Sequence, residues 1–309
     1  TYNVAVGAYA LDASTTANSG TAIGYNALGA NTTGQSNTAV GSLALDAATT
    51  ADQNTAIGYN ALTATTDGGA NTAVGSEAMA ANTTGASNTA VGYLALDANT
   101  TASYNVAVGR AALGANTTGA SNTALGKDAL EANTTASSNV AIGAYALETN
   151  TTGATNTAVG RSALSLNTTA SNNVAVGYNS LLSNTTGTNN VMVGTTAGDA
   201  ITTASNNTGI GHDVLGANTS GDLNTAVGST ALNTNSTGAN NTAVGYAALT
   251  ENTTGASNVA VGTNALDANT TTNQNTAIGY NALTANTAGN NTAVGNQAME
   301  ANTTGNINV

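Results

Sequence analysis

Apolar and polar residues recur along this chain at fixed positions relative to a repeating glycine. The glycine stands every 17 residues from Gly7 to Gly279, and the last copy, Gly295, follows after 16. A fixed period of this length indicates repeats that stack on their neighbours. The sequence therefore predicts 18 coils of about 17 residues in one continuous array over 1–309. Because both ends stop within the pattern and no cap is visible, we expect a fragment of a longer chain.

Alternation before the glycine predicts a short strand with two different faces. The residue before the glycine is always Val, Ile or Leu, Thr or Val stands two places earlier, and Ala lies between them in 16 of 18 coils. Four residues after the glycine comes Leu, as at Leu28. With a period of two, we expect Val40 and Val74 to face a dry interior with Leu28. Ala39 and Ala73 would then face outward.

A continuous row of outward alanines would permit another backbone to approach closely. A single chain also has little apolar area per coil to bury on its own. We therefore expect three identical chains to pack in parallel through this row. The predicted interface residues are Ala39, Ala73, Ala90, Ala124 and Ala158.

The remaining positions favour β-structure with polar corners. Seventeen residues are too few for a helical hairpin, and Asn and Thr-Thr pairs disfavour helix. The predicted fold class is all-β, a parallel β-solenoid of the β-roll type, on the order of 85 Å long at about 4.8 Å per coil. One Asn recurs in 17 of 18 coils and a second in 14 of 18, which predicts amide ladders at the corners. A second glycine, as at Gly34, alternates with Ala, as at Ala51, so we expect no left-handed backbone there.

The motif Asn-Thr-Ala-Val-Gly-x-x-Ala-Leu at 37–45, with Asn-Thr-Thr-Gly at 82–85, resembles the repeats of phage-type tail-fibre-domain proteins. It is more loosely similar to the β-roll heads of trimeric autotransporter adhesins. The resemblance extends over the whole chain. It implies a left-handed parallel β-roll, three chains side by side, and a role as a spacer or adhesive surface.

Composition and charge exclude several classes of function. The chain has no Phe, Trp, Pro or Cys, and only 6% of its residues are charged, so any core must be thin and built from small aliphatic residues. A net charge of −12 repels phosphate backbones, so we expect no nucleic-acid partner. No apolar run is long enough to span a bilayer, which predicts no membrane insertion by this segment. We also expect no cofactor and no enzymatic activity, because no coil offers clustered catalytic groups.

The two positions after the glycine vary most and are predicted to form an exposed edge. Basic residues in this edge would provide a stripe for an anionic glycan or an acidic neighbour, and tyrosines would provide a glycan-contacting surface; the alternative is a solvated face. The candidate contact residues are Arg110, Lys127, Arg161, Tyr25, Tyr59, Tyr93, Tyr178, Tyr246 and Tyr280.

Other candidate sites have weaker sequence support. His212 lacks partners for a catalytic triad or metal site, so it is expected to be surface decoration. Acids share the position five after the glycine, but the calcium β-roll motif is missing, so no metal site is predicted. These acids are Asp12, Asp46, Asp97, Glu131, Glu148, Asp199, Asp267 and Glu300. Thr pairs such as Thr83-Thr84 suggest an ice-binding face as an alternative. Adjacent residues of a strand point to opposite sides, however, so a corner position of these pairs is the preferred interpretation.

The region 190–215 departs from the repeat. Met192 replaces Ala, Gly198 replaces Leu, Ile201 replaces Asn and Gly209 replaces the next Ala. Three interpretations stay open: a local bulge with Ile201 refilling the core, a bend, or a receptor-contact spot. The bulge is the preferred one.

The leading functional hypothesis is a structural shaft of an extracellular, cell-surface or virion-tail fibre, which holds a receptor-binding tip away from the surface. The chain itself, as a homotrimer, is the expected partner. The alternatives are an adhesin module that binds a cell-surface glycan through the Tyr/Arg column, and an ice-binding solenoid.

Overall fold

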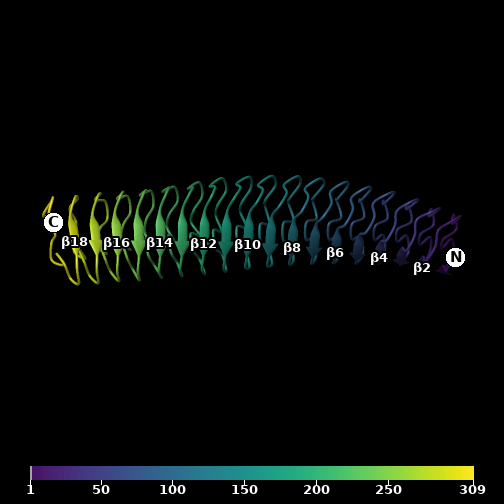
Figure 1. Cartoon of the computed structure of the whole chain (residues 1–309), viewed down its shortest axis with the longest axis horizontal. Coiled ribbons are helices and arrows are strands. Elements are labelled where there is room, and N and C mark those ends of the chain that lie inside the picture. The colour runs from purple at the N-terminus through teal and green to yellow at the C-terminus, as the bar shows by residue number, and fades with distance from the viewer. Residues whose placement is uncertain (1) are drawn as a thin grey trace. The chain divides into compact units, whose positions relative to one another are not determined.

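The computed structural model describes residues 2–309 as two compact units, one ending at Thr155 and one over Asn156–Val309. Each unit is a stack of coils with one three-residue strand per coil, and the loops that complete the coil run back beside the strands (Figure 1). The strands of the first unit are β1 (Val4–Val6), β2 (Thr21–Ile23), β3 (Thr38–Val40), β4 (Thr55–Ile57), β5 (Thr72–Val74), β6 (Thr89–Val91), β7 (Val106–Val108), β8 (Thr123–Leu125) and β9 (Val140–Ile142). Those of the second are β10 (Thr157–Val159), β11 (Val174–Val176), β12 (Val191–Val193), β13 (Thr208–Ile210), β14 (Thr225–Val227), β15 (Thr242–Val244), β16 (Val259–Val261), β17 (Thr276–Ile278) and β18 (Thr292–Val294).

Within each unit every strand pairs in parallel with the next one along the chain. Ala39 lies opposite Ala56, for example, and equivalent positions of consecutive coils are in register throughout. In the last pair Ala277 lies opposite Ala293, so the coil that is one residue shorter keeps the strand register. The parallel β-solenoid of roughly 17-residue coils is confirmed.

The assignment of the two strand faces from sequence is wrong. Ala39 and Ala73 are fully buried, whereas Val40 and Val74 lie half-buried on the outer face. Leu28 is fully buried, as expected. The coil folds back so closely that the strand's inner side chain is Ala in nearly every coil, and beside the one large inner residue, Met192, a β-carbon built on Gly209 of the next strand would lie 2.6 Å from Met192 Sδ and 3.1 Å from Val214 Cγ1. Methyl groups opposite leucines fill this narrow interior.

The predicted trimer interface fails for the same reason. All five of its residues have no exposed surface within their own coil stack and cannot reach a second chain: Ala39, Ala73, Ala90, Ala124 and Ala158. The small size of this column is a packing requirement of the interior. It therefore says nothing about a neighbouring chain.

The return from strand to leucine row depends on unusual backbone conformations. The repeating glycine has φ near 140°, and a β-carbon on Gly92 would lie 2.5 Å from the carbonyl oxygen of Gly109 in the next coil. The buried Leu has positive φ as well, 54° at Leu96, in a region that L-residues rarely adopt. Its N–H donates to Ala112 of the next coil at 2.9 Å, and such inter-coil bonds offset the strain. The second glycine, as at Gly34, has no left-handed φ, as predicted.

Two amide ladders run along the coils, and both are buried. In the ladder before the strand, Asn37 Oδ1 accepts the backbone N–H of Asn54 at 2.9 Å, while Asn37 Nδ2 donates to the carbonyl of Ala51 at 2.7 Å. In the other ladder, Asn99 Nδ2 donates to Asn82 Oδ1 at 2.8 Å. The side chains therefore satisfy corner backbone groups and each other, which confirms the predicted corner ladders.

The irregular coil is a repacked core without a bulge. Met192 pairs in register with Ala175 and Gly209, so β12 is not bulged. Met192 and Ile201 are fully buried and occupy the space vacated at Gly198, where a β-carbon would lie 2.9 Å from both Met192 Sδ and Ile201 Cδ1. Ile201 does refill the core, but it interrupts the ladder and leaves Asn184 Oδ1 buried without a hydrogen-bond partner.

The reversed faces predict opposite effects for two neighbouring substitutions. Ala90→Asp places an unpaired charge in the interior and should lower the free energy of unfolding by several kcal/mol, whereas Val91→Asp on the outer face should cost about 1 kcal/mol or less. Thermal unfolding followed by circular dichroism at two protein concentrations separates loss of the core from loss of association. If Val91→Asp proves the more damaging of the two within the chain, the observed register is incorrect.

A second pair of variants tests the close approach of consecutive coils. Gly109→Ala combines a φ of 134° with a β-carbon 2.5 Å from the Gly126 carbonyl oxygen, and should cost about 2–4 kcal/mol. Gly114→Ala is the control, because its nearest neighbour is 3.2 Å away and its backbone is not left-handed. Equal melting temperatures for the two variants would contradict the proposed packing.

Candidate binding surface

The exposed tyrosine column follows the strand directly. Each of its members stands one residue after the repeating glycine, at the corner where the chain leaves the strand. In the first unit Tyr25, Tyr59 and Tyr93 are 55%, 51% and 50% exposed. Tyr178, Tyr246 and Tyr280 are comparably exposed in the second unit. The predicted exposed edge is therefore present within each unit.

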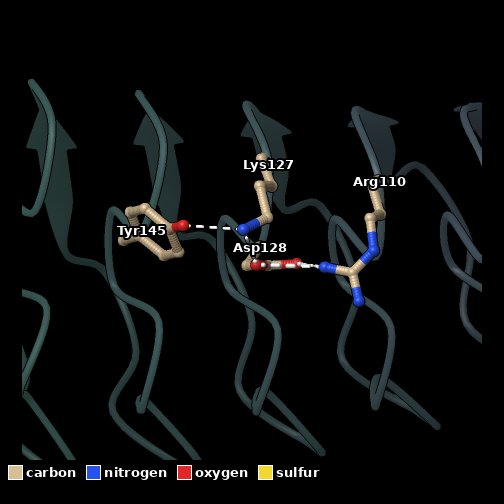
Figure 2. A network of polar contacts seen from close by, with 4 residues as sticks. All are labelled: Arg110, Lys127, Asp128 and Tyr145. Carbon is tan, nitrogen blue, oxygen red and sulfur yellow. Dashed lines mark hydrogen bonds and ion pairs between the residues drawn. The ribbon is translucent and has the colours of Figure 1, made fainter.

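The basic residues of this edge form ion pairs, a hydrogen bond and cation–π contacts with neighbouring side chains. Figure 2 shows Asp128 between Lys127 and Arg110, with Tyr145 beyond Lys127 in the next coil. Asp128 is almost fully buried and lies 2.9 Å from Arg110 Nη1 and 3.3 Å from Lys127 Nζ. Lys127 Nζ also donates to the Tyr145 hydroxyl at 2.6 Å and lies 4.8 Å from the centre of its ring.

These contacts reduce the cationic character of the predicted stripe. One carboxylate faces two cations in the first unit, and Arg161 in the second unit lies over the ring of Tyr178 at 5.7 Å. Sequence reasoning missed Asp128 as a bridge between the two cations, and it also missed the contact of Tyr145 with Lys127. The spacing of 18 residues between Arg110 and Asp128, one coil plus one residue, is the signal that could have found the pair.

Several acids of the neighbouring column are held in places that disfavour their charged form. Burial raises the pKa of Asp97, with a smaller contribution from Glu77, and burial followed by Glu251 raises the pKa of Asp267. Burial also raises the pKa of Glu131 and Asp199, with nearby carboxylates adding to it. Asp267 Oδ1 is buried without a hydrogen-bond partner, which agrees with a disfavoured carboxylate.

The described part of the chain has neither a pocket nor a cluster of metal-ligating side chains. The surface of residues 2–309 has no detectable pocket, and no three His, Cys, Asp or Glu side chains there are grouped to hold a metal ion. None of its segments forms a helix with the length and hydropathy that a bilayer crossing requires. His212 is exposed.

Threonine hydroxyls at the corner take part in the stack itself. Thr32 Oγ1 donates to the carbonyl of Thr49 at 3.0 Å, and Thr83 Oγ1 donates to that of Thr100 at 2.9 Å. The first Thr of each of these pairs is thus directed to a neighbouring coil, which favours a corner role over a flat ice-contacting array.

The raised carboxyl pKa values predict a stability that increases on acidification. For a group whose folded pKa lies above its unfolded value, the folded state binds more protons in between, so the free energy of unfolding is highest below the unfolded pKa, 3.8 for Asp, and falls as pH rises through the folded pKa. The net charge of −12 acts in the same direction. The combined variant D97N/E131Q/D199N/D267N should therefore melt at a higher temperature than the parent at pH 7 and gain less between pH 7 and pH 4. An identical gain in parent and variant would show that these four groups are not responsible.

In comparisons with known proteins, no protein-family model matches the chain, and no curated protein matches it. The likeness to tail-fibre repeats therefore rests on the repeat motif alone. What the geometry establishes is a β-solenoid repeat protein of roughly 17-residue coils with exposed side-chain columns and no detectable pocket over residues 2–309.

Proposed function

We propose that the chain is a structural shaft of an extracellular or viral adhesive fibre, assembled from three parallel copies. A single observation carries the proposal: the outward position before the repeating glycine is Val, Ile or Leu in all 18 coils. A strand position that met only water would accept Lys, Glu or Thr equally well. Restriction to apolar side chains at an outward site is typical of a covered surface.

The apolar side chains of the outward column are partly exposed to solvent in the single chain. Ile23, Ile57 and Leu125 are 40%, 40% and 45% exposed, and Ile142 is similar at 36%. The position two residues earlier adds Thr or Val on the same face, so each unit presents a continuous strip of mostly β-branched side chains. This strip replaces the alanine row as the proposed contact between chains.

The strip is large enough for a specific interface. A three-residue strand is about 10 Å wide and consecutive strands are about 4.8 Å apart, so nine coils offer on the order of 400 Å² of face. Each unit carries a strip of this size, and a standard protein interface takes about 800 Å² from each partner. A second copy of this chain is the natural occupant, because an identical strip has the same coil spacing.

A spacer role agrees with the remaining chemistry. Each unit repeats one structural element with few departures in its core, and nine coils span roughly 40 Å at the usual strand spacing. The sequence variation is concentrated at the corners and leaves the strip unchanged. The shaft would serve to separate a tip from the surface that carries it.

The assembly can be tested by changing the strip without touching the interior. The variant V74K/V91K/V108K brings like charges together across the proposed interface and should convert a trimer into monomers, with little change in the circular dichroism spectrum. The matched control T84K/T101K/T118K adds the same charge at exposed corner positions of the same coils and should remain trimeric. Sedimentation or light scattering gives the mass. A monomeric parent at micromolar concentration, or a trimeric strip variant, would overturn the proposed assembly.

A further inference from the structure

Large and small residues alternate along the tyrosine column. In the first unit the column reads Tyr25, Ser42, Tyr59, Ser76, Tyr93 over five consecutive coils, and in the second it reads Tyr246, Thr263, Tyr280 over three. The tyrosines are therefore 34 residues, or two coils, apart. The shaft alone does not require this alternation, because the inner strand residue is Ala in coils with Tyr and with Ser alike.

The alternation leaves tyrosine rings uncovered. A ring with Ser on both sides has no aromatic neighbour one coil away, and no aromatic ring or cation within residues 2–309 stacks on Tyr59 or Tyr93. The ring of Tyr178, by contrast, lies under Arg161, and that of Tyr145 under Lys127. Tyr25 meets Tyr9 only edge to face, which leaves the column's rings available to a ligand.

The spacing selects a class of ligand. Two coils correspond to about 9.6 Å along the stack. An extended β-1,4-linked chain of pyranoses turns each sugar over relative to the previous one, so it presents the same sugar face every second residue, at nearly the same interval. The C–H face of a pyranose packs on the electron-rich face of an aromatic ring, and its hydroxyls pair with side chains such as Ser.

We propose that the tyrosine column binds extended, uncharged β-1,4-linked polysaccharide, with each Tyr under every second sugar and each Ser or Thr near the sugar between. A neutral polymer fits a chain of net charge −12 better than an anionic one. The polymer of glucose and that of N-acetylglucosamine share this geometry. The shaft would then also be an adhesive surface along its length, and this inference does not depend on the number of chains in the assembly.

Binding to insoluble cellulose and to chitin beads, with cross-linked dextran as the α-linked control, tests the inference on the full chain. Retention on cellulose, chitin or both is expected, and the two matrices distinguish the sugars. The variant Y25A/Y59A/Y93A/Y246A/Y280A should bind at least about tenfold more weakly, since each aromatic contact contributes a factor of about 2–10. Tyr104→Ala, an exposed tyrosine outside the column, should bind like the parent.

A register exchange isolates the spacing from the composition. In a Y246S/Y280S background, S42Y/Y59S keeps the same residues but places the three tyrosines one and three coils apart. Affinity should fall about 2–10-fold, because the ring moved to position 42 no longer matches the alternate sugars under Tyr25 and Tyr93, which stay four coils apart. Unchanged melting temperatures verify folding.

Equal affinity before and after the exchange, equal retention on dextran, or no retention on either β-1,4 polymer would overturn the inference. If the protein is a trimer that binds neither polymer, the polysaccharide inference fails and the proposed shaft stands. If it is a monomer that binds them, the proposed trimeric shaft fails and the polysaccharide inference stands.

Discussion

The narrowness of the coil governs most of this structure. The strand and the leucine row lie so close that only a methyl group fits between them, and the alanine column follows from this distance. Larger aliphatic residues of the strand are consequently displaced to the outer face. The one coil with a large residue in the strand interior supports this view, since Met192 occurs together with glycines at both Gly198 and Gly209.

A core made of Ala and Leu gives little apolar burial per residue, so hydrogen bonds carry an unusual share of the specificity. Each coil buries asparagine amides whose donors and acceptors are satisfied by corner backbone and by the next coil. Leaving any of these groups unpaired would cost free energy, which ties the sequence of each corner to that of its neighbours. The substitution of Thr65 for Asn fits this constraint, because its hydroxyl accepts from Asn82 Nδ2 at 3.2 Å and donates to the Asn82 carbonyl at 3.0 Å.

Sequence periodicity was sufficient to predict the coil length, the strands, the corner ladders and the exposed tyrosines, because each depends on a residue type repeated at one position. It failed on the orientation of the strand. Alternation shows that Ala39 and Val40 point to opposite faces but does not say which face is inside, and hydrophobicity favoured Val. The distance across the coil decides which face is inside. The positive φ of Leu28 and Gly41 sets this distance, and the residue type gives no sign of a positive φ at a leucine. The bridge at Asp128 was missed for a related reason, since it depends on the lateral offset between coils.

Both amide ladders have a direction. The side-chain oxygen of Asn37 accepts from Asn54, and that of Asn82 accepts from Asn99, so a finished coil offers acceptors to the coil that follows it. At a synthesis rate of about 5–20 residues per second, a new coil leaves the ribosome roughly every 1–3 s and meets a template already in place. The chain is thus suited to vectorial folding from its N-terminal coils onward, in which every coil nucleates the next and no long-range search is needed.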